Sequence, residues 1–339
     1  MISYTQLHAT NRQNLVDVLP LKKPFTVLIE PSSLCNFRCV HCFQSLKEEN
    51  FLSRLRLNMD LSLYRKIIEQ LRSWSGAKLK VLKLSLYGEP LLNPDFAEML
   101  KMAKHADIAE RVETTTNASL LTRKIAQGMV DHQLDYLRVS VYSPDQQKHE
   151  DITGSKLDIR SIHDNLSMLQ ELKKLAGRER PFVAVKMLDT YGPGNDDFIK
   201  MYQDVADEIY IDKPHNWTMT EGARFTDALY KDTAAAVQDM HAESQHRRVC
   251  PMAFTTMAVR SNGDVAPCCI DFNGGTNLGN VNRIDLKGLW LSEAWHKFML
   301  MQLEDRKQDN VSCSRCDFYK SGHYIKDNID GFDARKLRC

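Results

Sequence analysis

The stretch Phe25-Thr-Val-Leu-Ile29-Glu-Pro-Ser-Ser-Leu-Cys35-Asn-Phe-Arg-Cys39-Val-His-Cys42 decides the fold of this chain. Its first five residues are apolar or β-branched and predict a β-strand. The three cysteines follow within eight residues of one another. We therefore expect all three to lie in a single loop at the C-terminal end of that strand.

Similar β-rich runs alternate with helical patterns as far as about residue 212. The expected strands are Phe25–Ile29, Lys80–Leu86, Arg111–Thr116, Tyr136–Val141, Phe182–Leu188 and Glu208–Ile211. Between them, apolar residues recur at helical spacing, for example over Leu61–Trp74, and Asn93-Pro94 is typical of a capped helix start. This α/β alternation predicts a parallel sheet in a partial (β/α)6 TIM-like barrel, with the site at the C-terminal strand ends.

The pattern changes after about residue 212. A turn at Ser261-Asn-Gly-Asp264 separates two short strands, and a helix is expected over about Ser292–Leu303. These features predict a small α+β domain after the barrel. We therefore divide the chain into an N-terminal extension over 1–24, a barrel domain over 25–240 and a C-terminal domain over 241–339.

Charge and hydropathy exclude several classes of function. The formal net charge is +1 and no long basic run occurs, so nucleic acid is not an expected partner. No apolar run reaches 18 residues and no signal pattern opens the chain, which predicts no membrane partner and a cytoplasmic location. Nine cysteines are an odd number for a disulfide framework, and their grouping predicts metal binding instead.

Cys35, Cys39 and Cys42 form the first group of cysteines. Three thiolates can hold three corners of a 4Fe–4S cluster and leave the fourth iron open to a substrate-like ligand. The alternative is a zinc site with His41 or a distant residue as fourth ligand. His41 directly precedes Cys42, and tetrahedral coordination by two neighbouring residues is awkward.

Cys250, Cys268, Cys313 and Cys316 form the second group. Four thiolates would fill all four irons of a second cluster, which could then pass electrons but could not bind a substrate directly. The alternative is a zinc ribbon, although such ribbons pair two CxxC knuckles and this sequence has one. Cys269 follows Cys268 directly, so one thiol of the doublet is spare, and the spacing from Gly263 favours Cys268 as the ligand.

The cysteine loop after the first strand resembles the radical S-adenosylmethionine (SAM) superfamily, and the resemblance covers about residues 24–212. The second group is similar to the auxiliary-cluster domains called SPASM and, in shortened form, twitch. The resemblance implies SAM bound at the open iron of a 4Fe–4S cluster, one auxiliary 4Fe–4S cluster, and an electron donor such as flavodoxin or ferredoxin. It also implies that SAM is split to methionine and a 5′-deoxyadenosyl radical, which takes hydrogen from a substrate C–H bond.

The resemblance further implies which strand ends contact SAM. The expected residues are Gly88, Glu89, Pro90, Asn117, Ser140 and, through backbone, Met187. Two positions depart from the pattern, because His41 stands where an aromatic ring is common and Tyr142 stands where many relatives carry Asp. Beyond the last strand, His215, Asn216 and Trp217 are expected at the mouth of the site, in contact with the substrate.

The reaction that we expect first is oxidation of a small polyhydroxylated molecule, a sugar or an aminocyclitol, with the auxiliary cluster as electron acceptor. The second is epimerisation of such a substrate with Cys269 as hydrogen donor. The third is modification of a peptide or protein, which is weakened because only about 24 residues precede the first strand. A zinc-binding structural protein is the non-enzyme alternative.

Overall fold

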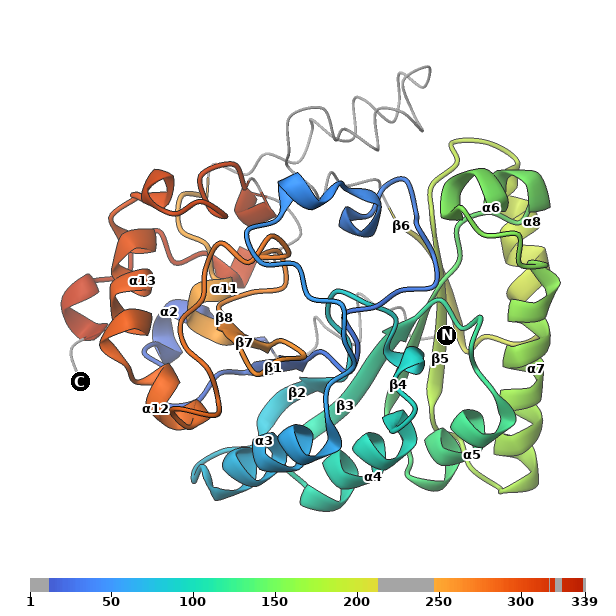
Figure 1. Cartoon of the computed structure of the whole chain (residues 1–339), viewed down its shortest axis with the longest axis horizontal. Coiled ribbons are helices and arrows are strands. Elements are labelled where there is room, and N and C mark those ends of the chain that lie inside the picture. The colour runs from blue at the N-terminus through green and yellow to red at the C-terminus, as the bar shows by residue number, and fades with distance from the viewer. Residues whose placement is uncertain (1–11, 213–246, 317, 321–324, 338–339) are drawn as a thin grey trace.

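The computed structural model describes residues 12–212, 247–316, 318–320 and 325–337 of the 339-residue chain. Within these residues a single sheet of eight strands runs in the order β6-β5-β4-β3-β2-β1-β7-β8. Helices cover the outer side of the curved sheet, and the C-terminal segments continue beyond β1 (Figure 1).

Six strands of this sheet form the barrel part. They are β1 (Thr26–Ile29), β2 (Leu79–Lys83), β3 (Ala109–Thr116), β4 (Tyr136–Ser140), β5 (Phe182–Leu188) and β6 (Glu208–Asp212). Each pairs in parallel with the next along the chain. The predicted partial (β/α)6 barrel is therefore confirmed, with every expected strand present.

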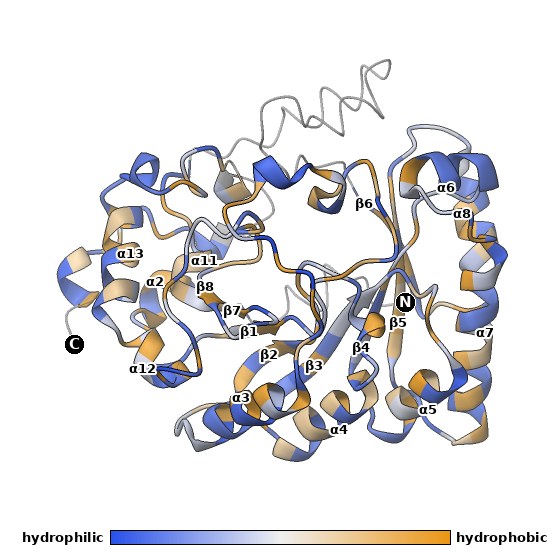
Figure 2. Ribbon diagram, in the orientation of Figure 1, coloured by the Kyte–Doolittle hydropathy of each residue, from blue (hydrophilic) through white to orange (hydrophobic). Residues whose placement is uncertain are grey.

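Helices connect these strands and pack on one face of the sheet. They are α3 (Leu61–Ser73), α4 (Phe96–Ala106), α5 (Arg123–Asp131), α6 (Gln146–Thr153), α7 (Arg160–Leu175) and α8 (Gly194–Tyr202). The outer helices carry both apolar and hydrophilic residues in Figure 2, as amphipathic helices do. Their buried side chains join strand residues such as Leu82 and Leu84 in the main core. Residues at alternate strand positions, such as Lys83, therefore face the inner, concave side of the sheet.

Two sequence predictions differ from the structure at the end of the second strand. β2 ends at Lys83 rather than Leu86, because the chain after Leu84 turns toward the cysteine loop, where Glu89 N–H donates to Leu34 O. α4 begins at Phe96, so the expected cap at Asn93 is wrong. The Asn93 side chain instead donates to Pro31 O and Met59 O and accepts from Asp95 N–H, because tertiary contacts hold it against the loop.

The C-terminal segment adds a hairpin to the barrel sheet. β7 (Thr256–Val259) pairs in parallel with β1 and antiparallel with β8 (Val265–Ala266). The turn between them is the predicted one, and Gly263 takes the left-handed conformation there with φ +87°. The other helices of this part are α11 (Met252–Thr255), α12 (Leu286–Trp290) and α13 (Glu293–Leu303).

A second core ties the start of the chain to the C-terminal segment. The short helix α2 (Leu15–Val18) places Leu15 beside Phe254 and Ile329 in this core. Trp290 Nε1 donates to Leu21 O at 2.9 Å. Short 3-10 turns complete the described structure at Phe43–Ser45, Glu48–Asn50, Pro90–Leu92, Lys307–Asp309, Phe318–Lys320, Ile325–Asp327 and Ala334–Leu337.

Candidate active site and cluster-binding cysteines

The first cysteine group lies in the loop that leaves the C-terminal end of β1, as predicted. Cys39 is buried with 5% of its surface exposed, while Cys35 and Cys42 are half-buried. Cys42 N–H donates to Cys39 O at 2.9 Å, and Gln44 N–H points at Cys42 Sγ at 3.5 Å. Hydrogen bonds to sulfur of this kind are typical of iron–sulfur ligands.

The segment 87–89 holds one side of this loop. Gln44 Nε2 donates to Ser33 O at 3.1 Å and to Tyr87 O at 2.9 Å, and Glu89 N–H donates to Leu34 O at 2.7 Å. A Cβ on Gly88 would lie 2.3 Å from the carbonyl oxygens of both Ser32 and Leu34. Glycine is therefore required at position 88 by close packing against the loop that carries Cys35.

The end of helix α6 holds the other side of the cysteine loop. Arg38 N–H donates to Thr153 O at 2.7 Å and Val40 N–H donates to Ile152 O at 2.8 Å. Thr153 is itself fully buried. The backbone on both sides of Cys39 is thereby fixed to the end of a helix.

The thiols of this loop are electrostatically suited to cations. Burial raises the pKa of Cys35 to about 12 and of Cys42 to about 11, and raises that of Cys39 well above its ordinary value. The charges of Cys35 and Cys42 each raise the pKa of Cys39 further. Three thiolates, one buried and two half-buried, repel one another and need a positive partner, and the irons of a 4Fe–4S cluster provide one while needing only thiolate ligands.

His41 and Tyr142, the two departures from the expected pattern, contact each other. Their ring centroids are 5.0 Å apart, and the Tyr142 hydroxyl hydrogen-bonds to the Cys39 thiol. Burial and, to a smaller extent, the charge of the Lys186 ammonium group lower the pKa of His41 to about 4. His41 is thus neutral near pH 7, and its ring packs on that of Tyr142. Tyr142, which stands where many relatives carry Asp, orients the Cys39 thiol.

The residues expected to contact SAM lie at neighbouring strand ends. Glu89 is buried and accepts from Leu91 N–H, Thr116 Oγ1 and Asn117 N–H, at 3.1, 2.6 and 2.8 Å. Asn117 Nδ2 donates to Asn36 Oδ1 at 3.0 Å, which links the end of β3 to the cysteine loop. Gly88 and Pro90 flank Glu89, and Ser140 ends β4.

Met187 is placed differently from these polar residues. Its side chain is completely buried in the main core. Only its backbone is left for a ligand, which is the kind of contact expected for it. His215, Asn216 and Trp217 lie outside the described residues, as does the proposed domain boundary at 240/241.

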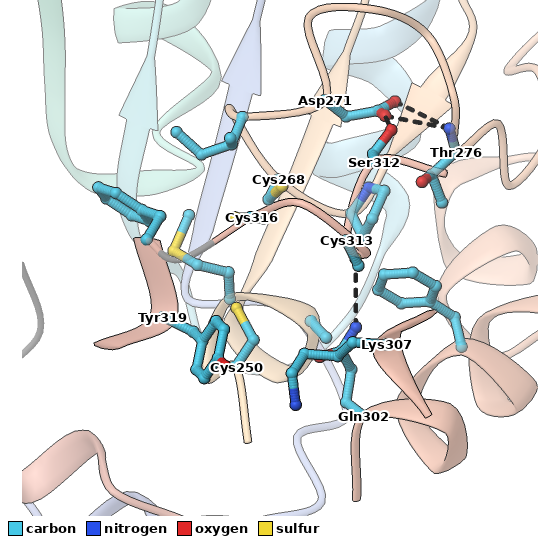
Figure 3. A pocket seen from close by; sticks show the side chains of 16 residues that line it. Cys250, Cys268, Asp271, Thr276, Gln302, Lys307, Ser312, Cys313, Cys316 and Tyr319 are labelled. Atoms are coloured by element: carbon cyan, nitrogen blue, oxygen red, sulfur yellow. Dashed lines mark hydrogen bonds between the residues drawn. The ribbon is translucent and has the colours of Figure 1, made fainter. Parts of the chain in front are cut away.

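The second cysteine group gathers at one pocket. Figure 3 shows the pocket lined by Cys250, Cys268, Cys313 and Cys316, which come from three separate segments. Gln302 Nε2 donates to Cys313 Sγ at 3.4 Å. Burial raises the pKa of Cys250 to about 12 and of Cys313 to about 11. A donor set of four half-buried thiols fits a fully ligated cluster.

Asp271 fixes the loops around this pocket. It accepts from Thr276 N–H at 3.0 Å and from the Ser312 hydroxyl group, next to Cys313 (Figure 3). Tyr87 reaches the pocket from the barrel side, where its hydroxyl donates to Cys268 O at 3.3 Å. The ring of Phe43, next to Cys42, stacks on Phe272 at 5.0 Å. The two cysteine groups are therefore connected by packed aromatic residues.

The doublet Cys268-Cys269 is split between two environments. Cys268 lines the pocket with the other three cysteines, whereas Cys269 is absent from its lining. Cys269 packs instead on Leu28, Ala258 and Ala266, which face the concave side of the sheet. The charges of Lys83 and Arg138, both on barrel strands, lower the pKa of the Cys269 thiol, while burial raises it more. The spare thiol is thus directed toward the barrel interior.

Sequence reasoning missed several of these residues. Tyr87 and Asn36 lie next to motif residues, but their partners are far away in the chain and no local spacing indicates them. Lys83 lies inside an expected strand, and its position between buried Leu82 and Leu84 is the signal that could have placed it on the concave face.

No three His, Cys, Asp or Glu side chains within the described ranges converge closely enough to hold a single metal ion. A cubane cluster spreads its thiolates over separate irons and does not require such convergence. No helix in the described part of the chain is long and apolar enough to cross a membrane.

The fold and the two cysteine groups define a class: a partial-barrel α/β enzyme with iron–sulfur sites at the strand ends. The model of the radical SAM superfamily matches residues 29–204, and that of an iron–sulfur cluster-binding domain, SPASM, matches residues 250–317. The chain belongs to the radical SAM superfamily. Membership favours a 4Fe–4S cluster with SAM over zinc at the first cysteine group.

Among curated relatives, the chain is similar to the S-adenosyl-L-methionine-dependent 2-deoxy-scyllo-inosamine dehydrogenase of Niallia circulans. The two are 21% identical over 297 residues, which cover 87% of this chain and 94% of the relative. A second similar protein is the tungsten-containing aldehyde ferredoxin oxidoreductase cofactor-modifying protein of Pyrococcus furiosus, 22% identical over 86% of this chain and 89% of that protein.

Among solved structures, the chain resembles BtrN in complex with AdoMet and 2-DOIA. The TM-score is 0.54 at 18% identity, with 92% of this chain and 98% of that chain covered. Streptococcus suis SuiB bound to the precursor peptide SuiA gives a TM-score of 0.60 at 14% identity, with 92% and 74% covered. At these identities the similarity establishes the shared fold.

Proposed function

We propose that this radical SAM enzyme is a dehydrogenase that oxidises an alcohol carbon of a small polyhydroxylated molecule of the sugar or aminocyclitol class. The observation that carries the proposal is the single pocket lined by four cysteines. A cluster with four thiolate ligands has no open iron, so its chemistry is electron transfer, and an alcohol oxidation requires an electron acceptor. Similarity to a dehydrogenase of an aminocyclitol over 94% of that protein supports the same substrate class.

The ligand assignments belong to this proposal. Cys35, Cys39 and Cys42 hold the cluster that binds SAM, and Gly88, Glu89, Pro90, Asn117, Ser140 and the Met187 backbone surround SAM. The pocket cysteines Cys250, Cys268, Cys313 and Cys316 hold one auxiliary 4Fe–4S cluster. A small reductant such as flavodoxin or ferredoxin supplies the electron that cleaves SAM, and the substrate segment includes His215, Asn216 and Trp217. The barrel domain extends over 25–240 and the auxiliary domain over 241–339.

The chain's own residues have definite tasks in this scheme. Glu89 collects three donors and thereby fixes the strand-end segments of β2 and β3 against the cysteine loop. Tyr142 and Gln44 orient Cys39 and Cys42 by hydrogen bonds to their sulfur atoms. The SAM cluster, when bound, supplies the electron that generates the hydrogen-abstracting radical.

The test is transfer of deuterium from candidate substrates into 5′-deoxyadenosine. Anaerobic, reconstituted enzyme is incubated with SAM, a reductant and C-deuterated cyclitols, aminocyclitols and sugars. The proposal requires that one of them delivers deuterium and yields a ketone with one equivalent of SAM consumed. Failure of the whole class, with a peptide delivering deuterium instead, would contradict it.

Epimerisation remains a second candidate because of the position of Cys269. Its thiol faces the concave side of the barrel rather than the auxiliary pocket, and its raised pKa keeps it protonated at neutral pH. A thiol there could return a hydrogen atom to a substrate radical. Product formed in deuterated water distinguishes the two: epimerisation places solvent deuterium on the product carbon without changing the oxidation level, whereas oxidation places none.

A further inference from the structure

Lys83 is the last residue of β2 and lies on the concave side of the sheet. Its neighbours Leu82 and Leu84 are completely buried in the main core beneath the helices. In register, Lys83 is paired with Leu28 on β1 and with Glu113 on β3. Leu28 belongs to the small apolar cluster on which Cys269 packs. Lys83 therefore reaches the same interior space as the Cys269 thiol.

The charged groups around Lys83 come from three other strands of the barrel, while β1 contributes the apolar Leu28. Glu113 on β3 is 3.9 Å from its ammonium group, and that carboxylate is engaged more closely by Arg111, at 3.0 Å. Arg138 on β4 and Lys186 on β5 face the same space, and Lys186 is paired with Asp212 at 2.8 Å. The Cys269 thiol completes the surroundings. Lys83 thus sits among other cations, with one shared carboxylate at the limit of ion-pair distance.

This environment brings the titration of the amine close to neutral pH. Burial and the positive charges of Arg138 and Lys186 together lower the pKa of Lys83 to about 8, against the opposing effects of Glu113 and Cys269. An amine that titrates close to working pH is suited to accept a proton, because both the free base and the driving force for transfer are then available. The side chain keeps 18% of its surface exposed, so it is not sealed inside the core.

We propose that Lys83 is the proton acceptor for the substrate hydroxyl group in the proposed oxidation. This inference rests on the proposed function. Hydrogen-atom abstraction leaves an unpaired electron on the alcohol carbon. As the carbon–oxygen bond becomes a carbonyl, the hydroxyl proton passes to Lys83 Nζ, and the auxiliary cluster, when bound at the four-cysteine pocket, would accept the one electron that the carbon releases. One hydrogen atom, one proton and one electron leave the alcohol, which balances its conversion to a ketone.

Two substitutions separate proton transfer from charge. Lys83→Arg keeps the positive charge but cannot lose a proton in the accessible pH range, and Lys83→Met removes both. Lys80→Met is the matched control, because Lys80 is on the same strand but exposed at the surface, paired with Glu110. For each enzyme, ketone and deuterated 5′-deoxyadenosine are measured in one reaction, using a substrate that transfers deuterium.

The proposal requires that Lys83→Arg and Lys83→Met still transfer deuterium while their ratio of ketone to 5′-deoxyadenosine falls at least about tenfold, as loss of a general base does. In the parent enzyme and the Lys80→Met control this ratio should rise with pH through about 8, since the free amine then accumulates. The ratio in Lys83→Arg should not change with pH. An unchanged ratio in Lys83→Arg would overturn the inference and leave the dehydrogenase proposal standing. If no polyol transfers deuterium to the parent enzyme, the proposed function itself fails.

A readout independent of activity tests the same residue. Trace acetylation of the reconstituted enzyme at a series of pH values, with the Lys83 peptide quantified by mass spectrometry, reports the free amine directly. Lys83 should become half-reactive near pH 8, about two units below a free lysine side chain added as internal standard. Reactivity that follows the standard up to pH 10 would contradict the proposal.

Discussion

At the residue scale, we expect alanine substitutions of the neighbouring residues Cys268 and Cys269 to have opposite effects on the iron content. Cys268 lines the four-cysteine pocket and Cys269 faces the barrel. Cys268→Ala should therefore remove the auxiliary cluster, about four irons, because a cubane loses a corner ligand. Cys269→Ala should keep the full iron and sulfide content. The measurement is iron and sulfide analysis with the absorption spectrum of reconstituted protein, and the reverse pattern would show that the ligand is Cys269.

The second prediction at the residue scale concerns the close packing of Gly88 against the cysteine loop. The new methyl group of Gly88→Ala would overlap the carbonyl oxygens of Ser32 and Leu34, which are backbone atoms and cannot rotate away. We expect a loss of about 1–3 kcal/mol of unfolding free energy, the range for overpacking, together with poor incorporation of the first cluster. Chemical denaturation and iron analysis check this. Gly331→Ala is the control, since nothing lies within 4 Å of its Cβ position, and equal behaviour of both variants would refute the packing argument.

The first cysteine group could be located from sequence because its spacing is local and its loop directly follows a strand. The direction of each thiol in the Cys268-Cys269 pair could not, since adjacent residues differ only in what the fold places beside them. Lys83 illustrates the same limit. Alternation assigns its face, but its unusual charge environment is created by Glu113, Arg138 and Lys186, which lie on three other strands.

At the element scale, the β7–β8 hairpin is fixed to the cysteine loop by a buried contact. Glu30, at the end of β1, accepts from Ser261 N–H at 2.9 Å and from the Ser261 hydroxyl group at 2.5 Å. Both residues are almost completely buried. The hairpin turn and the start of the cysteine loop are therefore held in one position relative to each other.

Ser261→Ala should weaken this connection. One hydrogen bond to a buried carboxylate is lost, which costs about 1–3 kcal/mol of unfolding free energy. Loss of that donor should also raise the pKa of Glu30 further above its ordinary value, since burial already raises it and the Ser261 hydroxyl group opposes that effect. The measurement is urea denaturation of Ser261→Ala and of the control Ser73→Ala, because Ser73 is an exposed serine at the end of α3. Equal midpoints for the two variants would show that the contact contributes no stability.

The elements of the barrel were predictable because each strand and helix carries its own periodicity, and the strand bounds differ by a few residues at most. The predicted start of α4 is early because the Asn93 amide group donates to two distant backbone carbonyl groups, which holds Asn93 before the first helical turn. Pairing of β7 with β1 was not predicted either. It joins residues more than 200 positions apart, and no local pattern specifies a partner at that distance.

At the scale of the whole molecule, the two cysteine groups predict the metal content. Reconstituted protein should hold about eight irons and eight sulfides, two cubane clusters by ligand count. Replacing Cys35, Cys39 and Cys42 together by Ala should leave about four irons. Cys42→Ala alone should abolish reductive cleavage of SAM to 5′-deoxyadenosine, measured by chromatography. Zinc in stoichiometric amount without sulfide, or persistent cleavage in Cys42→Ala, would contradict the assignment.

The parallel pairing of β7 with β1 has a consequence for any shortened form of the protein. A partial barrel has two free strand edges, and an exposed edge invites pairing with another chain. Here β7 covers the β1 edge, and Glu30 N–H donates to Val259 O at 2.9 Å to continue the pairing beyond the strands. Cutting the chain before residue 247 would uncover the backbone donors and acceptors of Thr26–Ile29. The isolated barrel is therefore expected to self-associate through that edge. In the intact chain, the C-terminal segment prevents this association by occupying the β1 edge.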